Sequence, residues 1–136
     1  IPGWYGGEYE TDAPVAANAV HPGAPETLAE VPVAVMLGLR LPLTGTWIRF
    51  FGVRYTLLGM KLLARRGIAP VLYVHPWELV DLPAVEGVPS RVYARTGEYM
   101  RRAVDRILRA DFEFVPVGQL AADATTAPSG GRPADG

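Results

Sequence analysis

The residues best suited to chemistry in this chain are the four that follow a short apolar run, His75-Pro76-Trp77-Glu78. An imidazole can donate or accept a proton near neutral pH, and the indole and carboxylate beside it offer a ring face and a charge. The preceding run, 71–74, is β-branched and aromatic, which indicates a strand buried on both faces in a parallel sheet. In α/β proteins, ligands and catalytic groups gather at the C-terminal ends of such strands. The sequence therefore places His75 where chemistry usually occurs.

A purely structural interpretation of the same residues stays open. Pro76 stops the strand and removes a backbone donor, so His75 can equally be a capped turn residue, with Trp77 packed on a neighbouring helix. The second histidine, His21, also precedes a proline and lies in a loop. The two histidines are far apart, and neither has a carboxylate at metal-ligand spacing. We therefore expect no complete metal site within this chain.

The elements that would position His75 follow from periodicity. Residues 53–66 predict a helix, because apolar side chains recur at helical spacing and cations crowd its last turn. The aromatic stretch just before it predicts a short helical turn, and residues 28–36 predict a first strand. The order of strand 28–36, helix 53–66 and strand 71–74 is typical of a βαβ unit with a parallel sheet. The loop 79–95 follows the second strand and would wall a cleft beside His75.

The clearest helix is predicted for residues 96–110, where apolar side chains form one stripe at i, i+3, i+4, i+7 and i+8. Arginines lie mainly off that stripe, which indicates a solvated face rather than an anion site. A last short strand, 113–117, and a helical turn, 118–122, follow. The chain thus divides into three parts: a loop-rich N-terminal segment 1–27, a folded α/β part 28–122 and a disordered tail 123–136 rich in small and polar residues.

The composition narrows the function classes. The chain has 136 residues, 49% of them hydrophobic, which fits one domain with a packed core. A net charge of -1 gives no electrostatic drive toward nucleic acid or an anionic membrane. The absence of cysteine excludes disulfides, thiolate nucleophiles and Cys-ligated metals, but it does not fix a compartment. No uncharged apolar run reaches the roughly 18 residues that a membrane span needs.

The stretch 70–78, Pro-Val-Leu-Tyr-Val-His-Pro-Trp-Glu, resembles the last conserved block of polysaccharide deacetylases of the NodB-homology class, carbohydrate esterase family four. In one branch of that family the block ends in His-Pro-Trp-Glu. Segments 85–90, 99–102 and 112–116 are similar to the C-terminal extension of the same branch. The resemblance runs over residues 2–120. It implies the C-terminal part of a distorted (β/α) barrel, with helices flanking a few mostly parallel strands.

The resemblance also implies an activity, the hydrolysis of N-acetyl groups on a carbohydrate with the help of a divalent, zinc-like metal. By position, His75 would be the general acid toward the leaving amine. Trp77 and Glu78 would bind substrate, as a pocket wall and an orienting carboxylate. The family's paired aspartates, metal-binding histidines and Arg-Pro block have no match in this chain. The expected partners are therefore a carbohydrate substrate and the missing N-terminal part of the barrel.

A second class of function remains open, a non-catalytic α/β module that binds carbohydrate or a partner protein. Sugars stack on aromatic faces, so exposed Trp4, Trp47 and Trp77 would favour this alternative, whereas buried tryptophans would only be core. A nucleic-acid-binding domain finds little support in the charge balance.

Overall fold

The computed structural model describes residues 13–21, 23–38 and 40–126. In chain order its elements are β1 (Val15–Ala16), η1 (Ala17–Ala19), β2 (Ala29–Glu30), α1 (Gly45–Ala64), η2 (Pro76–Leu79), η3 (Ser90–Val92), α2 (Glu98–Leu108) and α3 (Val117–Thr126), where η marks a 3-10 helix. Long extended segments join them. The longest helix, α1, is the frame on which the candidate residues are placed.

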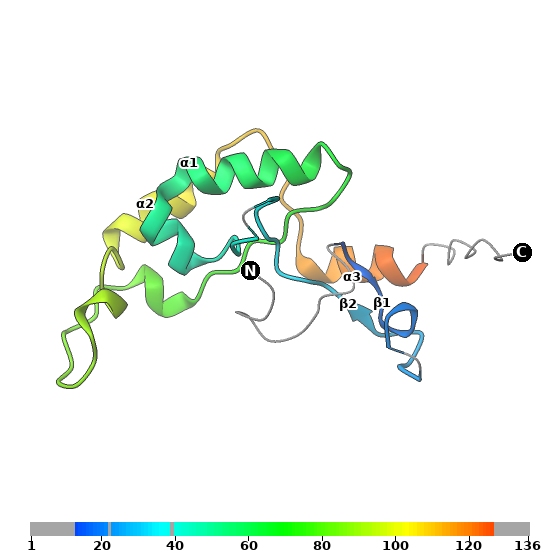
Figure 1. The fold of residues 1–136 in the computed structure, drawn as a ribbon, viewed down its shortest axis with the longest axis horizontal. Helices are drawn as coiled ribbons and strands as arrows, with labels where there is room; N and C mark the ends of the chain where they lie inside the picture. Colours follow the sequence, from blue (N-terminus) through cyan, green and yellow to red (C-terminus); the bar gives the residue numbers. More distant parts are fainter. Residues whose placement is uncertain (1–12, 22, 39, 127–136) are drawn as a thin grey trace, which may run out of the picture.

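The elements gather at two ends of an elongated molecule (Figure 1). At one end α1 packs against α2, and η2 lies beside α2. At the other end β1 and β2 pair antiparallel, with Val15 opposite Glu30, and α3 packs against both strands. The extended segments before and after α1 run between the two ends. His75 belongs to the α1 and α2 end, because it directly precedes η2.

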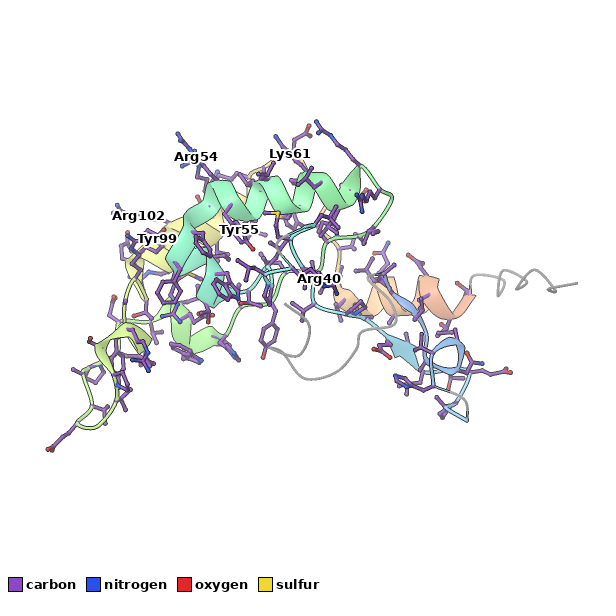
Figure 2. All side chains as sticks on the ribbon, viewed as in Figure 1. Arg40, Arg54, Tyr55, Lys61, Tyr99 and Arg102 are labelled. Carbon is purple, nitrogen blue, oxygen red and sulfur yellow. The ribbon has the colours of Figure 1, made fainter. Side chains whose placement is uncertain are left out.

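Helix α1 is longer than the predicted helix 53–66 and contains a break. Gly52 has φ 79° and ψ 175°, so the aromatic turn before it and the predicted helix after it are two helical segments joined at a kink. Arg54 and Lys61 point outward from the second segment (Figure 2). The Tyr55 hydroxyl instead donates to the Leu41 carbonyl at 3.1 Å, and burial raises the pKa of this phenol.

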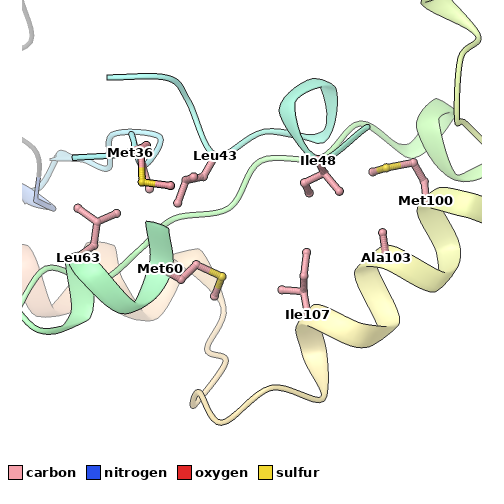
Figure 3. Close-up of a cluster of buried hydrophobic side chains, with 9 residues drawn as sticks. Met36, Leu43, Ile48, Met60, Leu63, Met100, Ala103 and Ile107 are labelled. Carbon is pink, nitrogen blue, oxygen red and sulfur yellow. The ribbon is translucent and has the colours of Figure 1, made fainter. Parts of the chain in front are cut away.

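The core lies between α1, α2 and the extended segment before α1 (Figure 3). Met100, Ala103 and Ile107 are buried on one face of α2, and Val104 packs against the core beside them, as the apolar stripe predicts. Leu108, the last residue of the predicted stripe, is instead 54% exposed. The side chains that pack against the buried face of α2 come from α1 and from the extended segment before it. They are Ile48, Met60 and Leu63 of α1, and Met36 and Leu43 of the extended segment. The predicted helix 96–110 is two residues longer than α2 at each end, a normal difference at frayed termini.

The predicted strands form few ladder hydrogen bonds among the described residues. Strand 28–36 is reduced to β2, because Pro32 has no N–H to donate, and a single antiparallel bridge joins Val35 to Pro42. The segment 71–74 is extended but makes only one parallel bridge, between Thr44 and Tyr73. A parallel sheet of several strands, and with it the barrel fragment, therefore stays a prediction.

The predicted strand 113–117 is replaced by a connection into α3. The Pro116 carbonyl accepts a hydrogen bond from the Gln119 N–H at 2.9 Å, so the chain already turns helical there. The predicted helical turn 118–122 lies inside α3, which continues to Thr126 and so takes the first four residues of the predicted tail.

The rest of the predicted tail, 127–136, and residues 1–12 of the loop-rich segment lie outside the described residues. The described part of that segment holds β1 and η1 and is otherwise loop. Across the ranges that the structure describes, no helix has the length and apolar character to cross a membrane.

Candidate functional site

His75 stands where the extended segment after α1 turns into η2. The Gly45 N–H donates to the Tyr73 carbonyl at 2.8 Å, which ties the segment to the start of α1. His75 is still extended, with φ -83° and ψ 139°, and Pro76 begins the 3-10 turn. The turn closes reciprocally: the Glu78 N–H donates to the His75 carbonyl, and the His75 N–H donates to Glu78 Oε2, both at 3.0 Å. The backbone of His75 is thus held through both its donor and its acceptor.

The Glu78 carboxylate is fully buried, and its charge is matched by Arg49 of α1. Arg49 Nε donates to Glu78 Oε1 at 3.0 Å, and the two side chains are 5% and 0% exposed. Arg49 Nη1 also donates to the carbonyls of Val92 and Ala94, at 2.7 and 3.1 Å. A buried charge is tolerated only when it is paired and hydrogen-bonded, as these two are. The pair therefore fastens the His75 turn to α1 and to the end of the loop 79–95.

Two glycines make room for this arrangement. A Cβ atom on Gly45 would overlap the Glu78 carboxylate, so the helix can approach the carboxylate only without a side chain there. Gly97 has φ 64°, donates its N–H to the Glu78 carbonyl at 2.9 Å, and would overlap Asp81 if it carried a Cβ. Glycine at these positions follows from close packing around Glu78 and from the positive φ.

Two aromatic rings contact the His75 imidazole. Tyr73 meets it edge-on, with ring centroids 4.7 Å apart and planes at 74°, and Trp77 stacks on it at 5.9 Å and 26°. The Arg49 guanidinium lies over the Trp77 ring, 5.2 Å from its centroid. The Tyr73 hydroxyl is 3.4 Å from His75 Nδ1. Tyr73 is exposed and His75 is half-buried, so the imidazole remains accessible to a ligand.

The three residues singled out in the sequence thus lie together, but in different environments. His75 and Trp77 reach the surface, whereas Glu78 contacts Arg49 and the His75 backbone and has no exposed area. Glu78 therefore fits the role of an orienting carboxylate better than direct contact with a ligand. Both carboxylate oxygens already accept hydrogen bonds, Oε1 from Arg49 and Oε2 from the His75 N–H.

Sequence reasoning missed Arg49 and Tyr73. The sequence contains an indication of each. Arg49 is the single charged residue of the aromatic stretch before Gly52, and a charge among apolar neighbours indicates a buried, paired side chain. Tyr73 is two residues before His75 on an extended segment, where alternate side chains share a face.

No group of three His, Cys, Asp or Glu side chains gathers in the described part of the chain. These residues therefore offer no metal centre of their own. The expectation that a metal would be bound elsewhere in a complete enzyme stays a prediction.

An open groove of about 520 Å³ lies between α1 and α2. Phe51 and Tyr99 contribute half-exposed rings to it, and Arg54, Arg102 and Arg106 contribute cations. Neither His75 nor Trp77 lines this groove. Its charged side chains are arginines and a Glu98 that is paired with Arg102, so the groove suits binding rather than proton transfer.

Comparison with known proteins gives one match. The family model described as a domain of unknown function, DUF3473, matches residues 3–122, so the chain belongs to this family. No curated protein and no solved structure matches the chain significantly.

Proposed function

We propose that this chain is the C-terminal part of a metal-dependent polysaccharide deacetylase and that it supplies the general acid, His75. The observation that carries the proposal is the construction of the His75 turn. Its backbone is hydrogen-bonded on both sides, its ring is flanked by Tyr73 and Trp77, and it still reaches the surface. Fixed geometry around an accessible imidazole is what proton transfer requires.

The role of this chain in the reaction is to deliver one proton. The imidazolium of His75 would lose a proton to the leaving amine of the sugar, and the exposed part of Trp77 would form a wall for the acetyl or sugar group. A divalent metal is implied by the resemblance to the NodB-homology class, but the described residues do not fit one. Its ligands would belong to an N-terminal part of the barrel.

The main chain beside His75 supports a partner of this kind. The Val71 carbonyl accepts from the Ala34 N–H at 3.0 Å, and Tyr73 bonds through its N–H and its carbonyl to the segment before α1 and to the start of α1. Leu72 and Val74 face the opposite edge, where their N–H and carbonyl groups have no hydrogen bond to any described residue. An unpaired edge of extended chain is suited to accept a further strand, which a barrel would provide.

The test is acetate release from N-acetylated chitin oligomers by the complete protein that contains this chain. His75→Ala should lower kcat by about 10²–10⁴-fold while metal content and melting temperature stay unchanged. His21→Ala is the matched control, because this second histidine is exposed and, among the described residues, its side chain pairs with Glu30, at 2.7 Å. Unimpaired kcat in His75→Ala would remove His75 from the mechanism. Loss of metal would instead make it a ligand.

The second candidate is a non-catalytic module that binds carbohydrate or a protein. The groove between α1 and α2 favours it, since the exposed rings of Phe51 and Tyr99 offer surfaces on which sugars stack. Binding of the oligomers without acetate release, abolished by Tyr99→Ala and unaffected by His75→Ala, would support this candidate over the deacetylase.

A further inference from the structure

We infer that Tyr73 is a positioning residue for His75: its hydroxyl occupies Nδ1 of the imidazole and leaves Nε2 as the nitrogen that faces a ligand. The catalytic meaning of this geometry rests on the proposed function. The geometry itself does not, and it can be measured without any activity.

The phenol of Tyr73 starts from a fixed backbone. The Tyr73 carbonyl accepts from Gly45 at 2.8 Å, and its N–H donates to the Leu43 carbonyl at 3.4 Å. Tyr73 and His75 are alternate residues of an extended segment, so their side chains share a face. The result is an edge-on ring contact with the phenol oxygen 3.4 Å from Nδ1.

A second ring contacts the imidazole. Trp77 stacks on it, with ring centroids 5.9 Å apart, and the Arg49 guanidinium lies over the indole, 5.2 Å from its centroid. Arg49 forms an ion pair with Glu78, whose carboxylate also accepts a hydrogen bond from the His75 N–H. The imidazole therefore contacts two aromatic rings and has a hydroxyl near Nδ1. Among the described residues, Nε2 has no hydrogen-bond partner.

This arrangement decides which proton can leave. In the imidazolium, Nδ1–H donates to the Tyr73 oxygen, and Nε2–H points to the ligand side. When a leaving amine takes the proton, the Nε2–H bond breaks and an N–H bond forms on the amine. The neutral imidazole keeps its remaining proton on Nδ1, and the Tyr73 oxygen accepts the hydrogen bond from this Nδ1–H. Tyr73 keeps its own proton throughout, because it can both donate and accept a hydrogen bond.

The direct test is to record the ring ¹⁵N resonances of His75 in the complete protein labelled at histidine. Tyr73→Phe keeps the ring packing and removes only the hydroxyl, so the Nδ1 resonance should move while Nε2 stays. The ring signals that disappear in His75→Gln are those of His75. Tyr55→Phe is the control, because it removes a different hydroxyl, bound to the Leu41 carbonyl, and should leave both His75 nitrogens unchanged. An unmoved Nδ1 signal in Tyr73→Phe, or a shift at Nε2 alone, would overturn the inference.

The kinetic test separates positioning from general stability. Tyr73→Phe should lower kcat about tenfold with KM and melting temperature unchanged, the size expected for one hydrogen bond. Wild-type kcat in Tyr73→Phe, in an enzyme that His75→Ala does impair, would contradict the positioning role. If His75→Ala leaves kcat unchanged, the proposed function fails. The ¹⁵N measurement then still decides whether Tyr73 occupies Nδ1.

Discussion

The buried Arg49–Glu78 pair is the interaction on which the His75 turn depends. Removing one member leaves an uncompensated charge away from water, so Arg49→Met or Glu78→Leu should each lower the free energy of unfolding by about 3–5 kcal/mol. The double replacement should cost less than the sum of the two single ones, since no unpaired charge remains. Urea unfolding of the complete protein that contains this chain, as wild type, two single variants and the double variant, measures this cycle.

The matched control is the pair Arg109–Asp105, 2.8 Å apart and exposed on α2. Arg109→Gln should leave the unfolding free energy nearly unchanged, because solvent screens an exposed pair. If Arg49→Met were as mild as Arg109→Gln, the buried pair would not hold the turn.

A substitution at Gly45 tests the close packing around Glu78, whereas the previous variants test its charge. A Cβ atom there would overlap the Glu78 carboxylate, so Gly45→Ala should destabilise the protein by about 1–3 kcal/mol through overpacking. Gly118→Ala is the control, because a Cβ at this position in α3 meets nothing within 4 Å. That substitution should be neutral or stabilise by up to about 1 kcal/mol. Equal effects of the two substitutions in thermal unfolding would contradict the close approach at Gly45.

At the scale of the elements, the break in α1 depends on one residue. Gly52, at φ 79° and ψ 175°, occupies a backbone region open essentially to glycine alone. Gly52→Ala should therefore cost about 1–3 kcal/mol, although its Cβ would meet only the Tyr99 hydroxyl, at an ordinary 3.6 Å. Circular dichroism during urea unfolding is the measurement. Greater helicity together with greater stability would show instead that α1 straightens without cost.

One carboxylate of α2 makes the stability depend on pH. Arg102 and then Arg101 lower the pKa of Glu98 through side-chain hydrogen bonds. A carboxylate whose pKa is lower in the folded state stabilises the fold above its unfolded pKa, and this contribution is lost as pH falls through the folded pKa. The melting temperature should thus decrease as the pH is lowered below about 4, and it should decrease less in Glu98→Gln than in the wild type.

The comparison for that experiment is Glu113→Gln, because Glu113 is exposed and has no ion pair to a described residue. Its melting temperature should follow that of the wild type from about pH 6 to about pH 3. If Glu98→Gln lost as much stability in acid as the wild type, the arginine pairs would not carry the effect.

At the scale of the whole molecule, exposed apolar side chains and backbone groups without a hydrogen-bond partner among the described residues lie near the site. The edge at Leu72 and Val74 lacks hydrogen bonds within the described residues, and the loop after η2 has exposed apolar side chains, Val80, Leu82, Val85 and Val88. We expect the 136-residue chain alone to be weakly folded or to self-associate. Sedimentation velocity over a range of concentrations measures this. A monomer with one sharp, reversible melt would favour a self-contained module.

The sequence by itself determined what depends on local periodicity. The apolar stripe of residues 96–110 predicted the buried face of α2, since the helical repeat alone selects which side chains face the core. The order His75-Pro76 predicted the end of the extended segment, because proline fixes its own φ and lacks an N–H. Trp77 and Glu78 were placed beside His75 for the same local reason.

The tertiary structure alone decided what depends on distant partners. Whether 71–74 becomes a strand depends on which chains lie beside it, and a single bridge to Thr44 was not visible in its composition. Arg49 and Glu78 are 29 residues apart, and only folding brings them to 3.0 Å. Local patterns report which way a side chain faces, whereas pairing of buried charges and strands is set by long-range packing. For that reason the sequence located the His75 turn, but the structure was needed to show what holds it.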